Sequence, residues 1–92
     1  QNVRVKFYNR SGYVLIDPED IIYGEADGNY TTIFLCSGEE EYVSMKISQV
    51  HQLINKTNLF IRLSRSYTIN KNYVTKVNHK KKIVTMERGN VK

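Results

Sequence analysis

Short alternating segments separated by turn residues make up most of this chain, and they restrict the folds that it can adopt. Val3, Val5 and Phe7 alternate with more polar residues, a pattern typical of a half-buried β-strand. Clusters of Asn, Asp, Ser and Gly then interrupt the chain as turns do. Together with the abundance of Tyr, Val, Ile and Thr, this predicts one mainly-β domain. About nine short strands are expected, at residues 3–8, 13–16, 21–26, 30–36, 40–44, 60–64, 67–70, 73–78 and 82–87.

Two segments have helical signals. Asp17-Pro18-Glu19-Asp20 is expected to form a turn or a single helical turn, with Asp17 as its cap. A longer helix is expected after Ser44 as N-cap, because Ile47, Val50 and Leu53 or Ile54 form an apolar stripe that faces the core. It should end within residues 55–58. A single helix of this kind excludes a helix-turn-helix mode of DNA binding, which needs two.

Residues 60–77 have a strand pattern with an interruption in it. If Ile61 and Leu63 face the core, strict alternation would carry Arg65 into the core, although Tyr67 and Ile69 also need that side. An unpaired buried guanidinium is too costly to expect. The backbone should therefore break at residues 64–66 and expose Arg65.

Charge is unevenly distributed along the sequence. Residues 1–45 have a net charge of −5 and residues 46–92 one of +10, which together give the +5 of the whole chain. In the second half Glu87 is the only acidic residue. A cationic field of this kind attracts polyanions and speeds their capture. Nucleic acid is the leading expected partner, and an anionic membrane surface is the second.

The sequence contains no recognisable catalytic or metal-binding constellation. His51 lies in the expected helix as a packing or surface residue, and His79 lies in a lysine-rich turn without a nucleophile or carboxylate at a motif spacing. Cys36 is expected to be a small buried hydrophobe. No apolar run approaches the ~20 residues of a membrane-spanning helix. We therefore expect a protein that is not an enzyme and that needs no cofactor or metal.

The candidate contacts with nucleic acid are polar and basic loop residues on a rigid β scaffold. Arg65, flanked by Ser64 and Ser66, could reach base edges or enter a narrow minor groove. A second set, beside the Asp27-Gly28-Asn29 loop, could donate to phosphates or to bases; it consists of Asn29, Tyr30 and Thr31. Phosphate contacts, which position a protein without reading sequence, are expected from Arg62, Lys71 and the turn containing Lys80, Lys81 and Lys82.

Three segments resemble the LytTR domain, the DNA-binding output domain of bacterial LytR/AlgR-type response regulators. They are Ile-Ile-Tyr-Gly-Glu-Ala-Asp-Gly-Asn-Tyr (21–30), Met-Lys-Ile-Ser-Gln-Val (45–50) and Phe-Ile-Arg-Leu-Ser-Arg-Ser-Tyr-Thr-Ile-Asn (60–70), and the resemblance runs from residue 13 to about residue 89. It implies an elongated, β-sandwich-like arrangement of small antiparallel sheets with one short helix, whose loops enter the DNA. The loop at Asn29 to Thr31 would enter a major groove, and Arg65 would lie at the intervening minor groove or its phosphates. Asn70 and Lys71 would support that loop or touch the DNA backbone.

The sequence departs from the family pattern at two places. Ser64 stands where the family usually has a histidine, so a contact from that histidine is missing. The family also continues past a glycine such as Gly89 into a final strand with a Ser-Arg pair that helps to hold DNA. This chain ends at Lys92, so that contact is not expected within it.

The expected function is sequence-specific binding of double-stranded DNA at promoter repeats, for the regulation of transcription. Residues 1–92 would form one LytTR-type domain, cytoplasmic and belonging to the C-terminal part of a longer two-component response regulator. The expected partners are DNA, a receiver domain and a second copy on DNA. The alternative is a β-rich interaction module that binds protein or an anionic membrane surface through its basic face. A binder of single strands or RNA ranks third, because it would need an exposed aromatic platform and the tyrosines are expected mostly at inward or strand-central positions.

Overall fold

The computed structural model describes residues 3–87 and 89–91, and it confirms a mainly-β fold with one α-helix in that part of the chain. In chain order the elements are β1 (Val5–Asn9), β2 (Gly12–Ile16), the 3-10 turn η1 (Pro18–Asp20), β3 (Ile21–Asp27), β4 (Tyr30–Leu35), β5 (Glu40–Val43), α1 (Ile47–Ile54), η2 (Asn55–Thr57), β6 (Phe60–Arg62), β7 (Tyr67–Asn70), η3 (Lys71–Tyr73), β8 (Val74–Asn78), β9 (Ile83–Met86) and β10 (Gly89–Val91). The strand β10, just past the expected ones, was not predicted.

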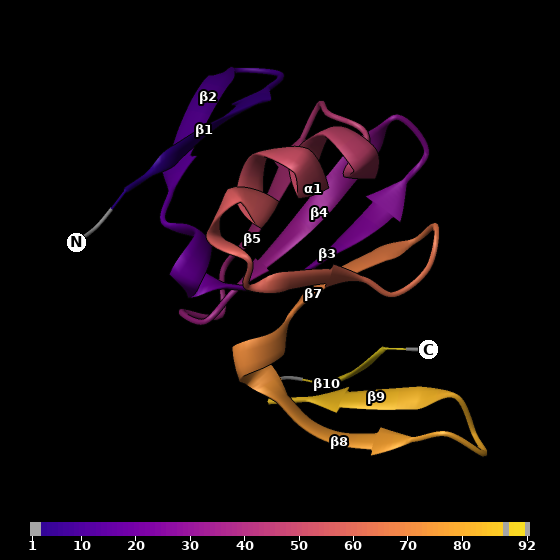
Figure 1. Cartoon of the computed structure of the whole chain (residues 1–92). Helices are drawn as coiled ribbons and strands as arrows, with labels where there is room; N and C mark the ends of the chain where they lie inside the picture. The colour runs from indigo at the N-terminus through magenta and orange to yellow at the C-terminus, as the bar shows by residue number, and fades with distance from the viewer. Residues whose placement is uncertain (1–2, 88, 92) are drawn as a thin grey trace.

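The strands form three antiparallel sheets (Figure 1). The largest has the order β5-β4-β3-β7-β6, so β3 pairs with both β4 and β7 at its centre. A hairpin of β1 and β2 and a smaller sheet of order β10-β9-β8 complete the fold. The molecule measures 41 × 32 × 23 Å along its principal axes, which fits the expected elongated arrangement of small sheets.

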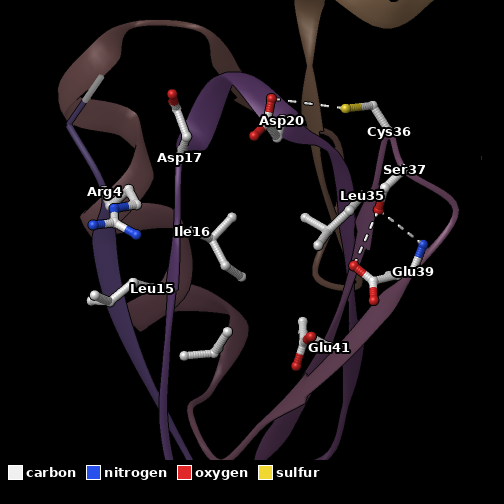
Figure 2. Close-up of a pocket in the computed structure, with 11 residues that line it drawn as sticks. Arg4, Leu15, Ile16, Asp17, Asp20, Leu35, Cys36, Ser37, Glu39 and Glu41 are labelled. Carbon is white, nitrogen blue, oxygen red and sulfur yellow. Dashed lines mark hydrogen bonds between the residues drawn. The ribbon is translucent and has the colours of Figure 1, made fainter. Parts of the chain in front are cut away.

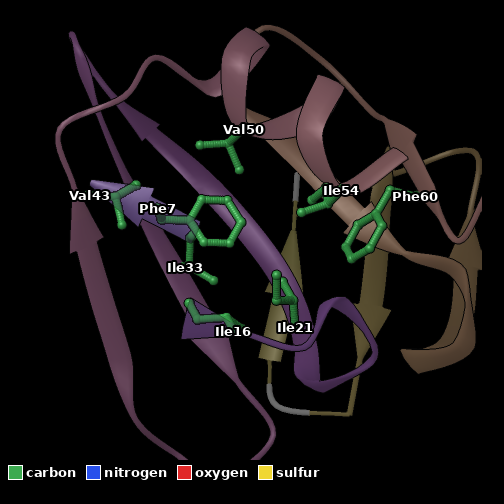
Figure 3. Packing of buried hydrophobic residues seen from close by; sticks show 8 residues of the cluster. All are labelled: Phe7, Ile16, Ile21, Ile33, Val43, Val50, Ile54 and Phe60. Carbon is green, nitrogen blue, oxygen red and sulfur yellow. The ribbon is translucent and has the colours of Figure 1, made fainter. Parts of the chain in front are cut away.

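The five-stranded sheet has an apolar cluster on each face. Adjacent residues of β3 belong to different clusters, Ile21 to one and Ile22 to the other, and a shift of register between Ile21 and Tyr23 lets Tyr23 pack against the second cluster as well. The first cluster lies between the sheet, α1 and the β1–β2 hairpin (Figure 3), and it contains Phe7, Ile16, Ile21, Ile33, Val43, Val50, Ile54 and Phe60. The second lies between this sheet and the C-terminal sheet of β8, β9 and β10, and it contains Ile22, Ile69, Val84 and Met86. Each such side chain contributes about 1.5–3 kcal/mol by leaving water.

The apolar stripe of α1 faces the core as expected, with Ile47, Val50 and Ile54 buried. The expected N-cap, Ser44, is wrong, because the helix begins later and Lys46 is its N-cap. The Gln49 side chain instead accepts the Lys46 backbone N–H at 3.0 Å, one half of a capping box. Ser44 contributes elsewhere, since its backbone N–H donates to the Tyr8 carbonyl at 2.8 Å and joins the hairpin to β5.

The expected single turn at residues 17–20 is confirmed. The Asp17 carboxylate accepts the Glu19 backbone N–H at 3.0 Å, and Pro18 stands at the first position of η1. This turn sets the direction in which the chain enters β3.

The interruption between β6 and β7 is also confirmed, but the first half of this segment is less buried than expected. Phe60 is buried, whereas Ile61 and Leu63 are 45% and 37% exposed. Ile61 pairs with Ile69 and therefore shares the face of the second cluster. Since β6 is the edge strand of its sheet, the C-terminal sheet covers Ile69 and leaves Ile61 half open.

Candidate nucleic-acid interface

Three loops come together at one end of the fold, on the right side of Figure 1. The loop between β3 and β4 and the loop between β6 and β7 are neighbours, because the Ala26 backbone N–H donates to the Ser66 carbonyl at 2.7 Å. The turn between β8 and β9 lies next to the β6–β7 loop. Leu63 and Ser64 on one side, and His79 and Lys82 on the other, line a shared hollow of about 370 Å³.

The β6–β7 loop is held in shape by Arg62. Its Nε donates to the Ser64 carbonyl at 3.1 Å and its Nη2 donates to the Arg65 carbonyl at 3.5 Å. The Ser64 hydroxyl accepts the Ser66 backbone N–H at 3.1 Å, and Leu63 N–H donates to the Tyr67 carbonyl at 3.0 Å to close the loop. Arg62 was expected to contact phosphate, but here its guanidinium is directed to the protein backbone.

Arg65, at the outer part of this loop, is exposed together with Ser64 and Ser66. Among the described residues, the guanidinium of Arg65 makes no hydrogen bond or ion pair, so its donors remain available for a ligand. The loop thus combines a fixed backbone with an unengaged cation, a combination that lowers the entropic cost of binding an anion.

The β3–β4 loop turns at Gly28, whose φ of +61° is in the left-handed region that glycine adopts without strain. Asn29 is exposed at the turn. Tyr30 stacks on Tyr42 with ring centroids 5.0 Å apart, and the Tyr42 hydroxyl donates to Asp27 Oδ2 at 2.8 Å. This hydrogen bond is the main cause of a raised pKa for Tyr42, with a smaller contribution from burial.

Two of the predicted contact residues are buried instead of presented at the surface. Thr31 is 0% exposed and its hydroxyl donates to the Met45 carbonyl at 2.8 Å. Asn70 is also 0% exposed; its Nδ2 donates to the Ile21 carbonyl at 3.0 Å and its Oδ1 accepts the Asn72 N–H at 2.9 Å. Neither side chain can reach a ligand in this conformation, because a fully buried group has no free surface. Their role is to fix the strands and the η3 turn that carry the loops.

The remaining basic candidates are exposed. Lys71 stands at the start of η3, and Lys80, Lys81 and Lys82 form the β8–β9 turn. That turn is ordered by Asn78, whose Oδ1 accepts the Lys81 N–H at 3.0 Å, and by a left-handed φ of +54° at Lys82. His79, which the sequence placed in this turn without a partner, lies in the hollow beside Ser64.

His51 has the packing role expected of it. Its Nδ1 lies 2.7 Å from the Thr68 hydroxyl, which ties α1 to β7. Burial lowers the pKa of His51 below its ordinary value, and the nearby charge of Arg62 lowers it further. The described residues contain no group of three or more metal-ligating side chains.

The opposite end of the fold is acidic. A groove of about 700 Å³ between β2 and the β4–β5 hairpin is lined by Asp17, Asp20, Glu39 and Glu41, with Arg4 on its edge (Figure 2). Cys36 also lines it and is only partly buried, with its Sγ 3.8 Å from Asp20 Oδ1. The expectation of a buried, purely apolar cysteine is therefore corrected. The carboxylates repel a polyanion from this end and favour its approach to the basic loops.

Part of this placement of side chains is visible in local sequence patterns. Alternation within β4 places Thr31 on the same side as the buried Ile33, which argues against a surface role. The hydrogen bonds of Arg62 to its own loop follow from no pattern of residue types.

No helix among the described residues is long and apolar enough to span a membrane.

Comparison with known proteins identifies a family and a similar fold. A family model described as the LytTr DNA-binding domain matches residues 11–92. One solved structure, from Bacillus cereus, is described as the LytTr DNA-binding domain of a methyl-accepting/DNA response regulator. It is similar with a TM-score of 0.76 and 19% sequence identity, over 99% of this chain and 84% of that one. No curated protein matches the chain. Because the family model accounts for most of the sequence, the chain belongs to the LytTr DNA-binding domain family.

Proposed function

We propose that this domain binds double-stranded DNA in a sequence-specific manner through its loops, as the output domain of a response regulator. DNA binding in the regulation of transcription is the function of the family to which the chain belongs. The finer proposal concerns how the DNA is contacted. Loops are the available elements, because α1 packs its apolar face onto the sheet and no second helix accompanies it among the described residues.

The observation that carries this proposal is the separation of charge between the two ends of the fold. Arg65, Lys80, Lys81 and Lys82 are exposed on neighbouring loops at one end, and four carboxylates line the groove at the other. Duplex DNA is a dense line of negative charge, so it favours such a surface. Asn29 and Arg65 would face base edges, whereas the lysines would contact phosphates.

The internal hydrogen bonds of the loops support a reading role for Arg65. A side chain can discriminate between bases only if its backbone is held in one place, and Arg62 binds the backbone carbonyls on either side of the Arg65 Cα, those of Ser64 and of Arg65 itself. Arg65 would donate to guanine in a major groove or enter a narrow minor groove. The loop at Asn29 would contact the adjacent groove.

The wider context belongs to the same proposal. A receiver domain elsewhere in the full-length protein would control this domain, and two copies would occupy paired half-sites in a promoter. Such a regulator would act in the cytoplasm. Pairing on DNA would raise the total affinity, because the second binding event becomes intramolecular.

The proposal can be tested in two steps. A preferred duplex is first selected from a random library with the wild-type domain, and the affinity of each variant for that duplex is then measured. Arg65→Ala should weaken binding to the selected duplex by roughly 1–3 kcal/mol and weaken binding to unselected duplexes much less. Lys56→Ala is the matched control. Lys56 is an exposed cation in η2, at the end of α1 away from the loops, and its loss should change little. Equal affinities of Arg65→Ala and wild type for the selected duplex would overturn the assigned role.

Competitor ligands separate this proposal from its alternatives. Single-stranded DNA should compete more weakly than duplex DNA at the same concentration of nucleotides. Vesicles containing anionic lipid should not retain the protein at moderate salt. Tight binding to such vesicles without any binding to duplex DNA would favour the interaction-module alternative.

A further inference from the structure

The turn between β1 and β2 is a fourth loop at the basic end, and it carries one cation at its tip. Arg10 and Ser11 are its central residues, because Asn9 pairs with Gly12 in the β1–β2 register. The Asn9 side chain accepts the Ser11 N–H at 3.0 Å, which fixes the turn. Arg10 is exposed and makes no hydrogen bond or ion pair within the described part of the chain.

The hairpin is anchored so that this tip lies beside the β3–β4 loop. The Ser44 backbone N–H donates to the Tyr8 carbonyl at 2.8 Å, and Phe7 is buried in the first cluster. Ser44 directly follows β5, whose last residue, Val43, pairs with Thr31 near the start of β4. The tip of the hairpin and the β3–β4 loop therefore end at the same edge of the molecule.

Electrostatics agree with this placement. The positive charge of Arg10 lowers the pKa of Tyr42 and so opposes the larger effect of Asp27, which raises it. Arg10 consequently lies within electrostatic range of the side chains that support the β3–β4 loop. Asp27 is the carboxylate of that loop, and it already accepts the hydroxyl of Tyr42.

We infer that Arg10 is a further contact with the DNA backbone, its guanidinium binding a phosphate next to the groove that receives the β3–β4 loop. The inference rests on the proposed function. A guanidinium suits this task because its parallel N–H donors match two phosphate oxygens. Arg10 precedes the residues that the family model matches, so the family does not assign it this role.

The test is the salt dependence of duplex binding by the 92-residue chain, measured by fluorescence anisotropy. Each phosphate contact contributes about 0.9 to the slope of log K against log salt concentration. Arg10→Ala should lower the slope by about that amount and weaken binding several-fold at low salt. Arg4→Ala is the matched control, since it removes the same charge just before the same hairpin, at the acidic groove. It should leave the slope unchanged.

A second comparison separates phosphate binding from simple neutralisation of Asp27. In an Asp27→Asn background the amide oxygen can still accept the hydroxyl of Tyr42, but the negative charge is gone. If Arg10 binds phosphate, Arg10→Ala should lower affinity in this background as it does in wild type. An effect that disappears in the Asp27→Asn background would overturn the inference.

The outcomes also distinguish this inference from the proposed function. Slopes that are equal for wild type, Arg10→Ala and Arg4→Ala, with duplex binding intact, would refute the role of Arg10 and leave the proposed function standing. Absence of duplex binding by the wild-type chain would refute both.

Discussion

The guanidinium of Arg62 donates through Nε to the carbonyl oxygen of Ser64 at 3.1 Å, so a charged side chain stabilises the loop that presents Arg65. The same guanidinium reaches the Arg65 carbonyl at 3.5 Å. Hydrogen bonds from a charged donor are stronger than those between neutral groups, and here they restrict a segment of four exposed residues. Arg62 therefore affects the candidate interface indirectly, by holding the backbone of the loop that carries Arg65.

Replacing Arg62 by alanine should weaken binding to the selected duplex by about 1 kcal/mol, because the β6–β7 loop becomes mobile and must be ordered on binding. Discrimination between selected and unselected duplexes should fall with it. The slope against salt should stay near the wild-type value, since no phosphate contact is lost. Anisotropy titrations at several salt concentrations measure both quantities.

Arg65→Ala provides the contrast within the same loop. It should lower the salt slope if its guanidinium replaces counterions on the DNA, whereas Arg62→Ala should not. Arg62→Lys is a further check, because a lysine keeps the charge but lacks the planar fork that reaches two carbonyls. An Arg62→Lys variant with wild-type affinity and discrimination would mean that charge alone is needed, and the positioning role would be wrong.

Asn70 should be important for stability and not for DNA contact. Asn70→Ala removes a fully buried side chain and leaves the Ile21 carbonyl and the Asn72 N–H without their partners, and it should lower the free energy of unfolding by about 2 kcal/mol. Urea unfolding followed by circular dichroism measures this loss. The exposed neighbour Asn72 serves as the control, and Asn72→Ala should cost less than about 0.5 kcal/mol. Similar losses for both variants would contradict the role given to Asn70.

The lysine turn should contribute affinity without sequence preference. Lys80→Ala and Lys81→Ala should each reduce the salt slope by up to about 0.9 and weaken selected and unselected duplexes in equal proportion. Lys56→Ala, at the other end of the fold, should do neither. If either turn variant changed the preference between duplexes while the slope stayed constant, a base contact would have to replace the phosphate contact.

Local alternation and turn chemistry were sufficient to predict most strands, the helix and the exposed break at Arg65. These features depend on a few neighbouring residues, which the sequence displays directly. The half-exposure of Ile61 has a different origin. Its exposure depends on the position of β6 at the sheet edge and on how far the C-terminal sheet extends over it, and both are tertiary facts.

The candidate site could be predicted only in part, again because local patterns are visible in the sequence and tertiary contacts are not. The loops and their exposed cations follow from charge and turn signals in the sequence. Asn70, however, bonds to the carbonyl of Ile21, 49 residues earlier, and Thr31 bonds to the carbonyl of Met45. A polar residue next to a loop can serve the surface or the core, and only the long-range pairing of strands determines which. The task of Arg62 is local, but it depends on a backbone conformation that residue types alone do not specify.

Stability should depend on pH through His51, whose folded-state pKa is lowered by burial and by the charge of Arg62. In the unfolded chain His51 returns to its ordinary value near 6.5, so the unfolded state takes up a proton first as the pH falls. The contribution of His51 to the free energy of unfolding should therefore be greatest above about pH 6.5 and decrease as the pH falls below that value. His51→Gln cannot titrate and should flatten the curve between pH 7 and about 5.5, where carboxylates still remain charged. Parallel pH dependence in both proteins, measured by urea unfolding, would assign the effect to other groups.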